Sequence, residues 1–272
     1  MGKVTARRSD GSTVEVRTSK KTRSVRLAHE KPVQIDLSGL GEVPALEDLY
    51  LSSTLSSVLD ALDVGPLAGR TFASLTAAVA GPIDLAPLSA CRLRSLSLDI
   101  GGSTALDLTP LREHPTLDHV HLAFHDQPAL DLSFATSMPA LRSLSISGGE
   151  WRTLELAPLR GLPLTSLTLA RQYISSVPLE VIAQPALEHL MLQELEINEG
   201  YLDLMPLHVC TKLQFLSLHQ NEVGTLEVSA LAGLATLRRF DPPNFKSMMM
   251  SAHAEPIVSP GLSRWRDNIG VE

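Results

Sequence analysis

The chain has 272 residues, of which 44 % are hydrophobic, and its formal net charge is −7 at pH 7. Only 4 % of the residues are aromatic, so aliphatic side chains must supply the core. Residues 1–31 hold nine Lys or Arg against three Asp or Glu, whereas the rest of the chain holds fourteen against twenty-seven. Phosphate contacts need a basic surface, so this acidic body argues against a general nucleic-acid-binding protein.

Residues 1–34 lack the spacing that governs the rest of the chain. Two short stretches of alternating apolar and polar residues flank the turn sequence SDGS at residues 9–12, which predicts a β-hairpin. We expect residues 1–34 to form an N-terminal cap on a repeat array, with a solvated basic rim from Arg17 to Arg26. A basic arm that docks on an acidic partner is the alternative.

One pattern then returns along the chain: an apolar residue, two free positions, an apolar residue, one free position and an apolar residue. Residues 141–146 (LRSLSI) are a clear copy, in which we expect Leu144 and Ile146 to point inward and Ser143 and Ser145 outward. A period of 21 to 26 residues is typical of a solenoid. The copies begin at Leu46, Phe72, Leu93, Leu117, Leu141, Leu164, Leu187, Leu213 and Leu237.

A second motif, an acid between two apolar residues, lies about eleven residues upstream of each copy. In several repeats Pro follows, which suits a tight turn better than a full helix. We expect each acid to accept amide hydrogen bonds from its own following turn; a basic ligand or divalent cations along this acidic edge are the alternatives. The acids are Asp36, Asp63, Asp84, Asp107, Asp131, Glu155, Asp203 and Glu227, and Pro178 interrupts their series.

The two motifs together resemble the leucine-rich repeat family, and residues 106–111 (LDLTPL) are similar to its bacterial, internalin-type branch. The resemblance covers roughly residues 35–245. It implies an α/β repeat solenoid of about nine repeats, with a parallel β-sheet on the concave face and short turns or 3-10 segments on the convex face.

One position departs from the family. Leucine-rich repeats usually place Asn three residues after the last apolar residue of the strand motif, and here only Asn221 keeps it. Backbone groups in the other turns must therefore find different partners. The residues that replace Asn are Thr54, Ala80, Gly101, His125, Gly149, Gln172 and Leu195.

The period ends after Phe240, because Pro242 and Pro243 cannot continue a ladder strand. Residues 246–272 carry enough apolar side chains to cover an open edge, including Met248 and Trp265. We expect a C-terminal cap over this segment, and a partner-binding tail or a swapped dimer contact is the alternative.

The outward strand positions predict the binding surface. Its middle is plain, with Ser74, Thr76, Ser95, Ser97, Ser143, Ser145, Ser166 and Thr168. The last three strands carry larger side chains, and interfaces depend on aromatic, Met and Arg anchors. A C-terminal segment folded back over these side chains would instead make them core. The predicted partner-binding residues are His189, Met191, Phe215, His219, Arg238 and Arg239.

A second candidate site lies on the fourth strand, where His119 and His121 are about 7 Å apart. A His-x-His pair on a strand can bind a metal, and Ser97 or Ser145 with His121 and Asp99 would be the residue types of a hydrolytic site. The neighbouring residues offer no obvious third metal ligand and no oxyanion hole. We therefore expect a secondary polar contact island at Asp118, His119 and His121, with no metal and no catalytic residue.

Cys91 and Cys210 precede the third and eighth strands, a separation of roughly 24 Å in stacked parallel strands, so we expect both to be free and buried. Free thiols suit a reducing compartment. The sequence has no apolar run of membrane-spanning length, and its first residues are polar where a secretory signal is apolar. We expect a bacterial, cytoplasmic protein that binds no membrane.

These observations predict a monomeric, non-enzymatic protein-interaction module that needs no cofactor. The expected partner is a protein or peptide on the concave face, with nucleic acid excluded. Two alternatives stay open: a metal-binding or hydrolytic site around His119 and His121, and a structural scaffold within an oligomer.

Overall fold

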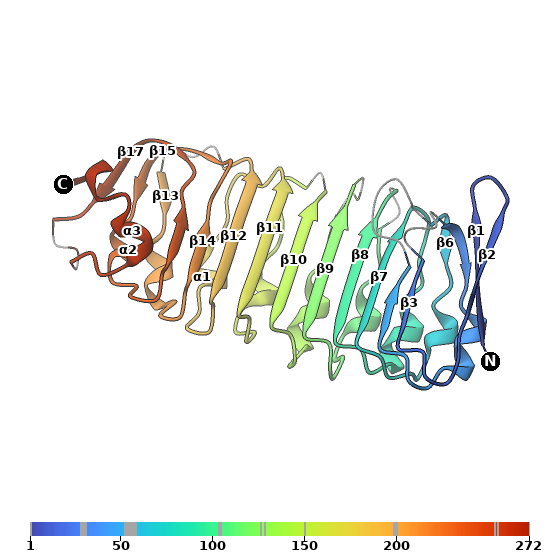
Figure 1. Cartoon of the computed structure of the whole chain (residues 1–272). Helices are drawn as coiled ribbons and strands as arrows, with labels where there is room; N and C mark the ends of the chain where they lie inside the picture. Colours follow the sequence, from blue (N-terminus) through green and yellow to red (C-terminus); the bar gives the residue numbers. More distant parts are fainter. Residues whose placement is uncertain are drawn as a thin grey trace. The chain divides into compact units, whose positions relative to one another are not determined.

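The structure is a computed structural model that describes residues 2–27, 32–51, 59–102, 105–125, 127, 129–149, 151–197, 201–252, 254 and 256–271 (Figure 1). Thr54, one of the residues that stand where the family has Asn, lies outside these ranges. The chain divides into two compact units, unit 1 from Met1 to Leu141 and unit 2 from Arg142 to Glu272.

Unit 1 contains a ladder of parallel strands that stack in register, so that Leu49, Leu75 and Leu96 align across three of them. Four of these strands begin two residues after a repeat start, as the motif predicts. The strands are β3 (Ser24–Arg26), β5 (Asp48–Tyr50), β7 (Ser74–Val79), β8 (Ser95–Ile100) and β9 (His119–Phe124).

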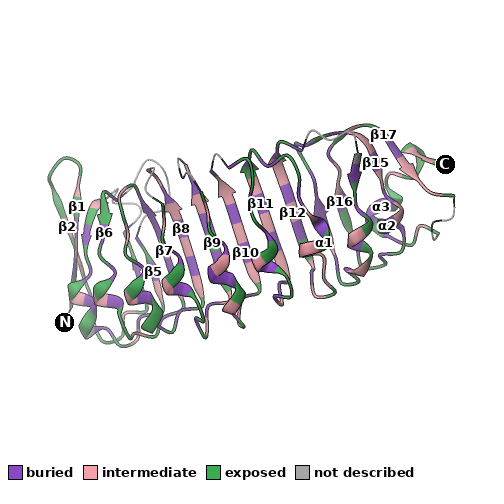
Figure 2. Ribbon diagram, turned by 180° about the vertical axis from the view of Figure 1, so that it is seen from behind, coloured by how far each residue is buried: buried purple, intermediate pink, exposed green. Residues whose placement is uncertain are grey.

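Unit 2 repeats this arrangement, with Leu144, Leu167, Leu190 and Leu216 aligned in the core. All four leucines are 0 % exposed, which is what places their polar neighbours on the opposite face. Figure 2 shows buried and half-buried residues alternating along these strands. The strands are β10 (Ser143–Gly148), β11 (Ser166–Gln172), β12 (His189–Leu195), β14 (Phe215–Ser217) and β16 (Arg239–Asp241).

Short helices connect successive strands. They lie on the side opposite to the one that the outward side chains of the strands face. Those of unit 1 are η2 (Ser38–Glu42), η3 (Gly65–Leu67), η4 (Ala86–Ala90), η5 (Thr109–Leu111) and η6 (Ser133–Ser137). Those of unit 2 are η7 (Ala157–Leu159), α1 (Leu179–Ile182), η8 (Met205–Val209) and α2 (Ser229–Ala232). Parallel strands joined by such short, mostly 3-10 turns confirm the predicted leucine-rich repeat solenoid.

The acidic motif builds these turns. In unit 1 the Asp107 carboxylate accepts the Thr109 amide at 2.9 Å, and in unit 2 the Asp203 carboxylate accepts the Met205 amide at 2.8 Å. The other six acids accept the amide two residues downstream in the same way, at 2.6 to 2.9 Å. These bonds confirm the predicted role of the acids. Side-chain hydrogen bonds, which contribute most at Asp107, act together with the amide bonds to lower the pKa of the Asp36, Asp107 and Asp131 carboxyls.

Each unit also has a smaller second sheet. In unit 1 its order is β2–β1–β4–β6, and β1 and β2 form an antiparallel hairpin. In unit 2 the order is β13–β15–β17–β18. The strands are β1 (Lys3–Arg8), β2 (Thr13–Arg17), β4 (Pro32–Asp36), β6 (Ala61–Leu62), β13 (Tyr201–Asp203), β15 (Glu222–Glu227), β17 (Asn244–Met250) and β18 (Ile269–Val271).

Two segments differ from expectation. The predicted solvated rim between Arg17 and Arg26 contains β3, whose Val25 is buried and pairs with Leu49, so it is partly core. After Pro242 and Pro243 the chain resumes as β17, which pairs in parallel with β15. The prolines therefore follow β16, the last strand of the larger sheet, but do not prevent parallel pairing in the smaller sheet. The predicted boundaries at residues 34 and 246 fall inside β4 and β17.

Candidate functional site

The unit 2 strand face consists of the outward side chains of β10, β11, β12, β14 and β16. Strand register sets it out in two rows. The first row is Ser143, Ser166, His189, Phe215 and Arg239. The second row is Ser145, Thr168, Met191, Ser217 and Asp241. The hydroxyl stripe therefore gives way to large side chains at β12.

Phe215 is the centre of the larger side chains. It is half-buried on its strand, and the Arg239 guanidinium carbon lies 5.1 Å from the centroid of its ring, which is cation–π geometry. The Asp241 carboxylate holds Arg239 in this place, accepting from Nε at 3.0 Å and from Nη2 at 2.7 Å. This bidentate contact raises the pKa of the Arg239 guanidinium.

All six predicted partner-binding residues are at least partly exposed. His189, His219, Arg238 and Arg239 are exposed, and Met191 and Phe215 are half-buried. All six are therefore accessible to a partner, and four of them, His189, Met191, Phe215 and Arg239, lie in the two rows of the strand face.

The alternative, a C-terminal segment folded over this face, is not what the structure shows. Helix α3 (Pro260–Ser263) packs against the backbone of the last strand, where the Gly261 amide donates to the Leu237 carbonyl at 2.7 Å. A Cβ added at Gly261 would lie 3.1 Å from the Arg239 amide nitrogen, so the approach is close enough to favour glycine. Leu262 is fully buried in this contact. The side chains in the two rows of the strand face stay at least partly exposed except Ser217, which is buried and accepts from Gln193 Nε2 at 2.6 Å.

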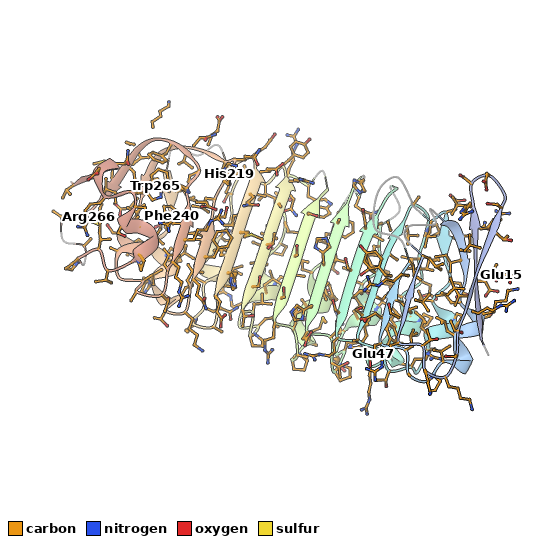
Figure 3. All side chains as sticks on the ribbon, in the orientation of Figure 1. Glu15, Glu47, His219, Phe240, Trp265 and Arg266 are labelled. Carbon is orange, nitrogen blue, oxygen red and sulfur yellow. The ribbon has the colours of Figure 1, made fainter. Side chains whose placement is uncertain are left out.

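A groove of about 710 Å³ adjoins the strand face. Its aromatic wall is formed by Phe245 and Trp265, whose ring centroids are 6.1 Å apart at an interplanar angle of 75°. Figure 3 shows His219 and Trp265 toward the same ends of the strands. The groove is lined by Gln193, His219, Arg239, Asp241, Pro242, Pro243, Asn244, Phe245 and Trp265.

The sequence interpretation missed several groove residues. Asp241 had a detectable signal, because it occupies the same outward position in its repeat as Met191. Phe245 and Trp265 had none, because they follow the last repeat and no period fixes their place.

The predicted polar island of Asp118, His119 and His121 lies at the start of β9 in unit 1, and a third histidine, His125, follows this strand. His119 pairs with Asp118, which also accepts from Arg94 Nη2 at 2.7 Å. Burial acts to raise the pKa of the Asp118 carboxyl, but its bonds from His119 and Arg94 outweigh burial and lower it. His125 Nε2 lies 2.7 Å from Asp99 Oδ1.

These pairings engage two of the three histidines with carboxylates. Ser97 aligns with His121 in the ladder, but Asp99, the acid considered for a hydrolytic arrangement, contacts His125. In the described ranges, no group of three or more His, Cys, Asp or Glu side chains is arranged to hold a metal ion. The island remains a predicted polar contact surface.

Cys91 and Cys210 are both free and buried, as predicted. Burial raises the pKa of each thiol, which disfavours the reactive thiolate. None of the helices in the described parts of the chain combines the length and the apolar character needed to cross a bilayer.

Comparison with known proteins gives similarity at the level of repeats. No family model matches the chain. A stretch of 123 residues, 44 % of the chain, is 35 % identical to the human leucine-rich repeat-containing G-protein coupled receptor 5, and the match spans 13 % of that receptor.

Two solved structures are similar in fold. An internalin from Listeria monocytogenes matches with a TM-score of 0.48 and 18 % identity, over 90 % of this chain and 80 % of that one. The plant peptide hormone receptor RGFR1, solved in complex with RGF2, matches with a TM-score of 0.44 and 17 % identity, over 79 % of this chain and 38 % of that one. By its own repeats and strand ladders, the chain folds as a leucine-rich repeat solenoid.

Proposed function

We propose that the chain is a non-enzymatic interaction module that binds a protein or peptide on the unit 2 strand face. The observation that supports this most strongly is the placement of Phe215. It is a half-exposed aromatic residue stacked under Arg239, on a face where the two rows carry only Ser and Thr on β10 and β11.

A soluble strand face has no need of such a cluster, whereas interfaces concentrate their binding energy in aromatic, Met and Arg side chains. Met191 lies diagonally across from Phe215, because their strands pair with His189 opposite Phe215 and Met191 opposite Ser217. Phe215, Met191 and Arg239 therefore supply one contiguous anchor, with His189, His219 and Arg238 around it.

The ladder also favours binding through its rigidity. The anchor side chains stand on strands whose inward residues, such as Leu190 and Leu216, are completely buried. Little chain needs to be ordered when a partner docks, so less of the contact energy is lost to conformational entropy. The small hydroxyls of β10 and β11 leave room for a partner's backbone to approach the strands and exchange hydrogen bonds.

The test is capture of a partner from a lysate of the source organism by three immobilised proteins. They are the wild type, the double variant Met191→Ser/Phe215→Ser, and a control with Tyr50→Ser/Thr76→Ala on the outward face of unit 1. We expect one specific protein to be retained by the wild type and the control and lost from the double variant. Equal retention by all three, with unchanged melting curves, would contradict the proposal.

A further inference from the structure

The end of unit 2 that forms the groove is basic within an acidic chain. Residues 238–267 hold five Lys or Arg against three Asp or Glu, while the whole chain carries −7. The cations of this segment are Arg238, Arg239, Lys246, Arg264 and Arg266, and all five are exposed. A groove with this surround attracts anions more than cations.

Hydrogen-bond donors in the groove are open to a ligand. Arg239 donates to Asp241 through Nε and Nη2, so its Nη1 donors remain for another acceptor. Among the described residues, the side chains of His219 and Asn244 make no hydrogen bond to protein. Asp241 is the one carboxylate among the described residues that line the groove, and it already accepts from Arg239, so it repels an incoming anion less than a free acid would.

The aromatic wall of the groove suits an apolar ligand group, unlike the polar donors beside it. Phe245 and Trp265 are half-exposed, meet edge to face and lie beside the stiff Pro242-Pro243 segment. An apolar side chain packed on such a wall gains burial without displacing a polar partner. The groove therefore combines cationic and amide donors with an apolar surface a short distance away.

We propose that this groove binds an extended acidic segment of the partner. One Asp or Glu side chain pairs with the free donors of Arg239, with His219 and Asn244 beside it, and a neighbouring apolar side chain packs on Phe245 and Trp265. The inference rests on the proposed function, because Arg239 belongs to both the anchor and the groove. It adds the chemistry by which the partner is selected.

The direct probe is an acetylated and amidated peptide of alternating Glu and Phe, compared with the same peptide carrying Gln in place of Glu. The chain has two tryptophans, and Trp151 is only 4 % exposed, so Trp265 reports on the groove by its fluorescence. We expect the Glu peptide to change the emission and to bind about tenfold more tightly than the Gln peptide at low salt, with the difference shrinking as salt rises.

A charge-neutral variant locates the binding. Arg239→Gln with Asp241→Asn removes the pair without changing net charge or leaving an unpaired carboxylate, and we expect it to abolish the preference for Glu. The matched control, Arg152→Gln with Glu196→Gln, removes two exposed charges elsewhere in unit 2 and should keep the preference. Asn244→Ala, an exposed side chain, should weaken binding of the Glu peptide and provides a second variant if the double one melts early.

Equal affinity for the Glu and Gln peptides, or a preference that survives the Arg239/Asp241 change, would overturn the inference. Tighter binding of a single-stranded oligonucleotide that displaces the Glu peptide, or self-association through the groove, would overturn it as well. The proposed function is judged separately: a partner lost on Met191→Ser/Phe215→Ser but retained on Arg239→Gln/Asp241→Asn would sink only the acidic-segment inference.

Discussion

The two units end their strands differently, and one repeat position makes the difference. In unit 1 the residue seven places after the repeat start is apolar and buried: Val79, Ile100 and Phe124. In unit 2 the same position holds Gly148, Arg171, Glu194 and Gln220, with φ of 71°, 57°, 53° and 59°. A left-handed residue interrupts the in-and-out alternation of a strand, whereas an extended one continues it.

The consequence appears at the next residue, where the family places its Asn. In four repeats of unit 2 this residue is buried, as Gly149, Gln172, Leu195 and Asn221, whereas in the last repeat Phe245 is half-exposed. In unit 1 it stays at least partly exposed, as Ala80, Gly101 and His125. An Asn or Gln side chain at this position can therefore bond buried backbone groups of neighbouring turns only in unit 2. In unit 1 the buried Gln127 donates to the Gly102 carbonyl at 2.7 Å and accepts from the Leu106 amide at 3.2 Å.

The sharpest test of this comparison is truncation of the side chain that lies seven places after the repeat start. Phe124→Ala in unit 1 should lower the free energy of unfolding by about 3 to 5 kcal/mol, because it empties a buried site. Arg171→Ala at the equivalent position of unit 2 should lower it by less than about 1 kcal/mol, since it removes only an exposed pair with Glu194. Urea unfolding of both variants measures the two values, and similar losses would break the comparison.

At the next residue, eight places after the repeat start, truncation should cost more stability in unit 2 than in unit 1. Asn221 donates to the Leu192 and Leu218 carbonyls at 2.7 and 2.8 Å and accepts from the Leu195 amide at 2.9 Å, all in buried surroundings. Asn221→Ala should therefore reduce stability by about 2 to 4 kcal/mol, because it leaves buried backbone groups unpaired.

His125→Ala is the matched change in unit 1 and should cost less than about 1 kcal/mol, because its bond to Asp99 is partly exposed. Thermal melting of the two variants side by side measures the contrast. A larger effect from His125 would mean that the amide ladder does not distinguish the units.

Unit 1 also contains a buried histidine that links its stability to pH. His114 is 1 % exposed, and its Nδ1 accepts from the Leu117 amide at 3.1 Å. Burial lowers the pKa of the His114 imidazole, so below about pH 6.5 the unfolded chain binds a proton that the folded chain does not. Stability should fall as the pH drops through this range, and His114→Gln should reduce that fall. Melting temperatures from pH 7.5 to 5 check it, and identical slopes would refute the assignment.

The smallest expected effect is a gain. Arg171 has a φ of 57°, which is unfavourable for a residue with a Cβ. Arg171→Gly should relieve that strain, offset in part by greater freedom of the unfolded chain, for a net gain of about 0.5 kcal/mol. Val79→Gly in unit 1 should instead destabilise, because Val79 is fully buried. A loss on Arg171→Gly would contradict the account of the turn.

The sequence motif located the strands because buried leucines recur at a fixed offset, as Leu75 and Leu144 do. β3 escaped because Thr22 stands where its repeat would begin with an apolar residue, although Val25 and Leu27 keep the later positions and are buried. The left-handed turns were not predicted from the sequence, because Arg, Glu and Gln give no local signal for positive φ.

The candidate site could be predicted only in part, for a related reason. Phe215 and Met191 followed from strand alternation, which is local. The groove depends on where the chain goes after Pro243, and Trp265 reaches it through contacts between segments that share no repeat. Long-range packing of this kind leaves no periodic trace in a sequence.

The most direct test of the central claim is Phe215→Ala, measured for partner affinity and melting temperature on the same preparation. Phe215 lies on the outward face, so we expect the dissociation constant for the captured partner to rise more than about fivefold, equivalent to 1 kcal/mol, with melting almost unchanged. Unchanged affinity would remove Phe215 from the interface. A loss of binding that simply follows a large loss of stability would make Phe215 a core residue and contradict the account.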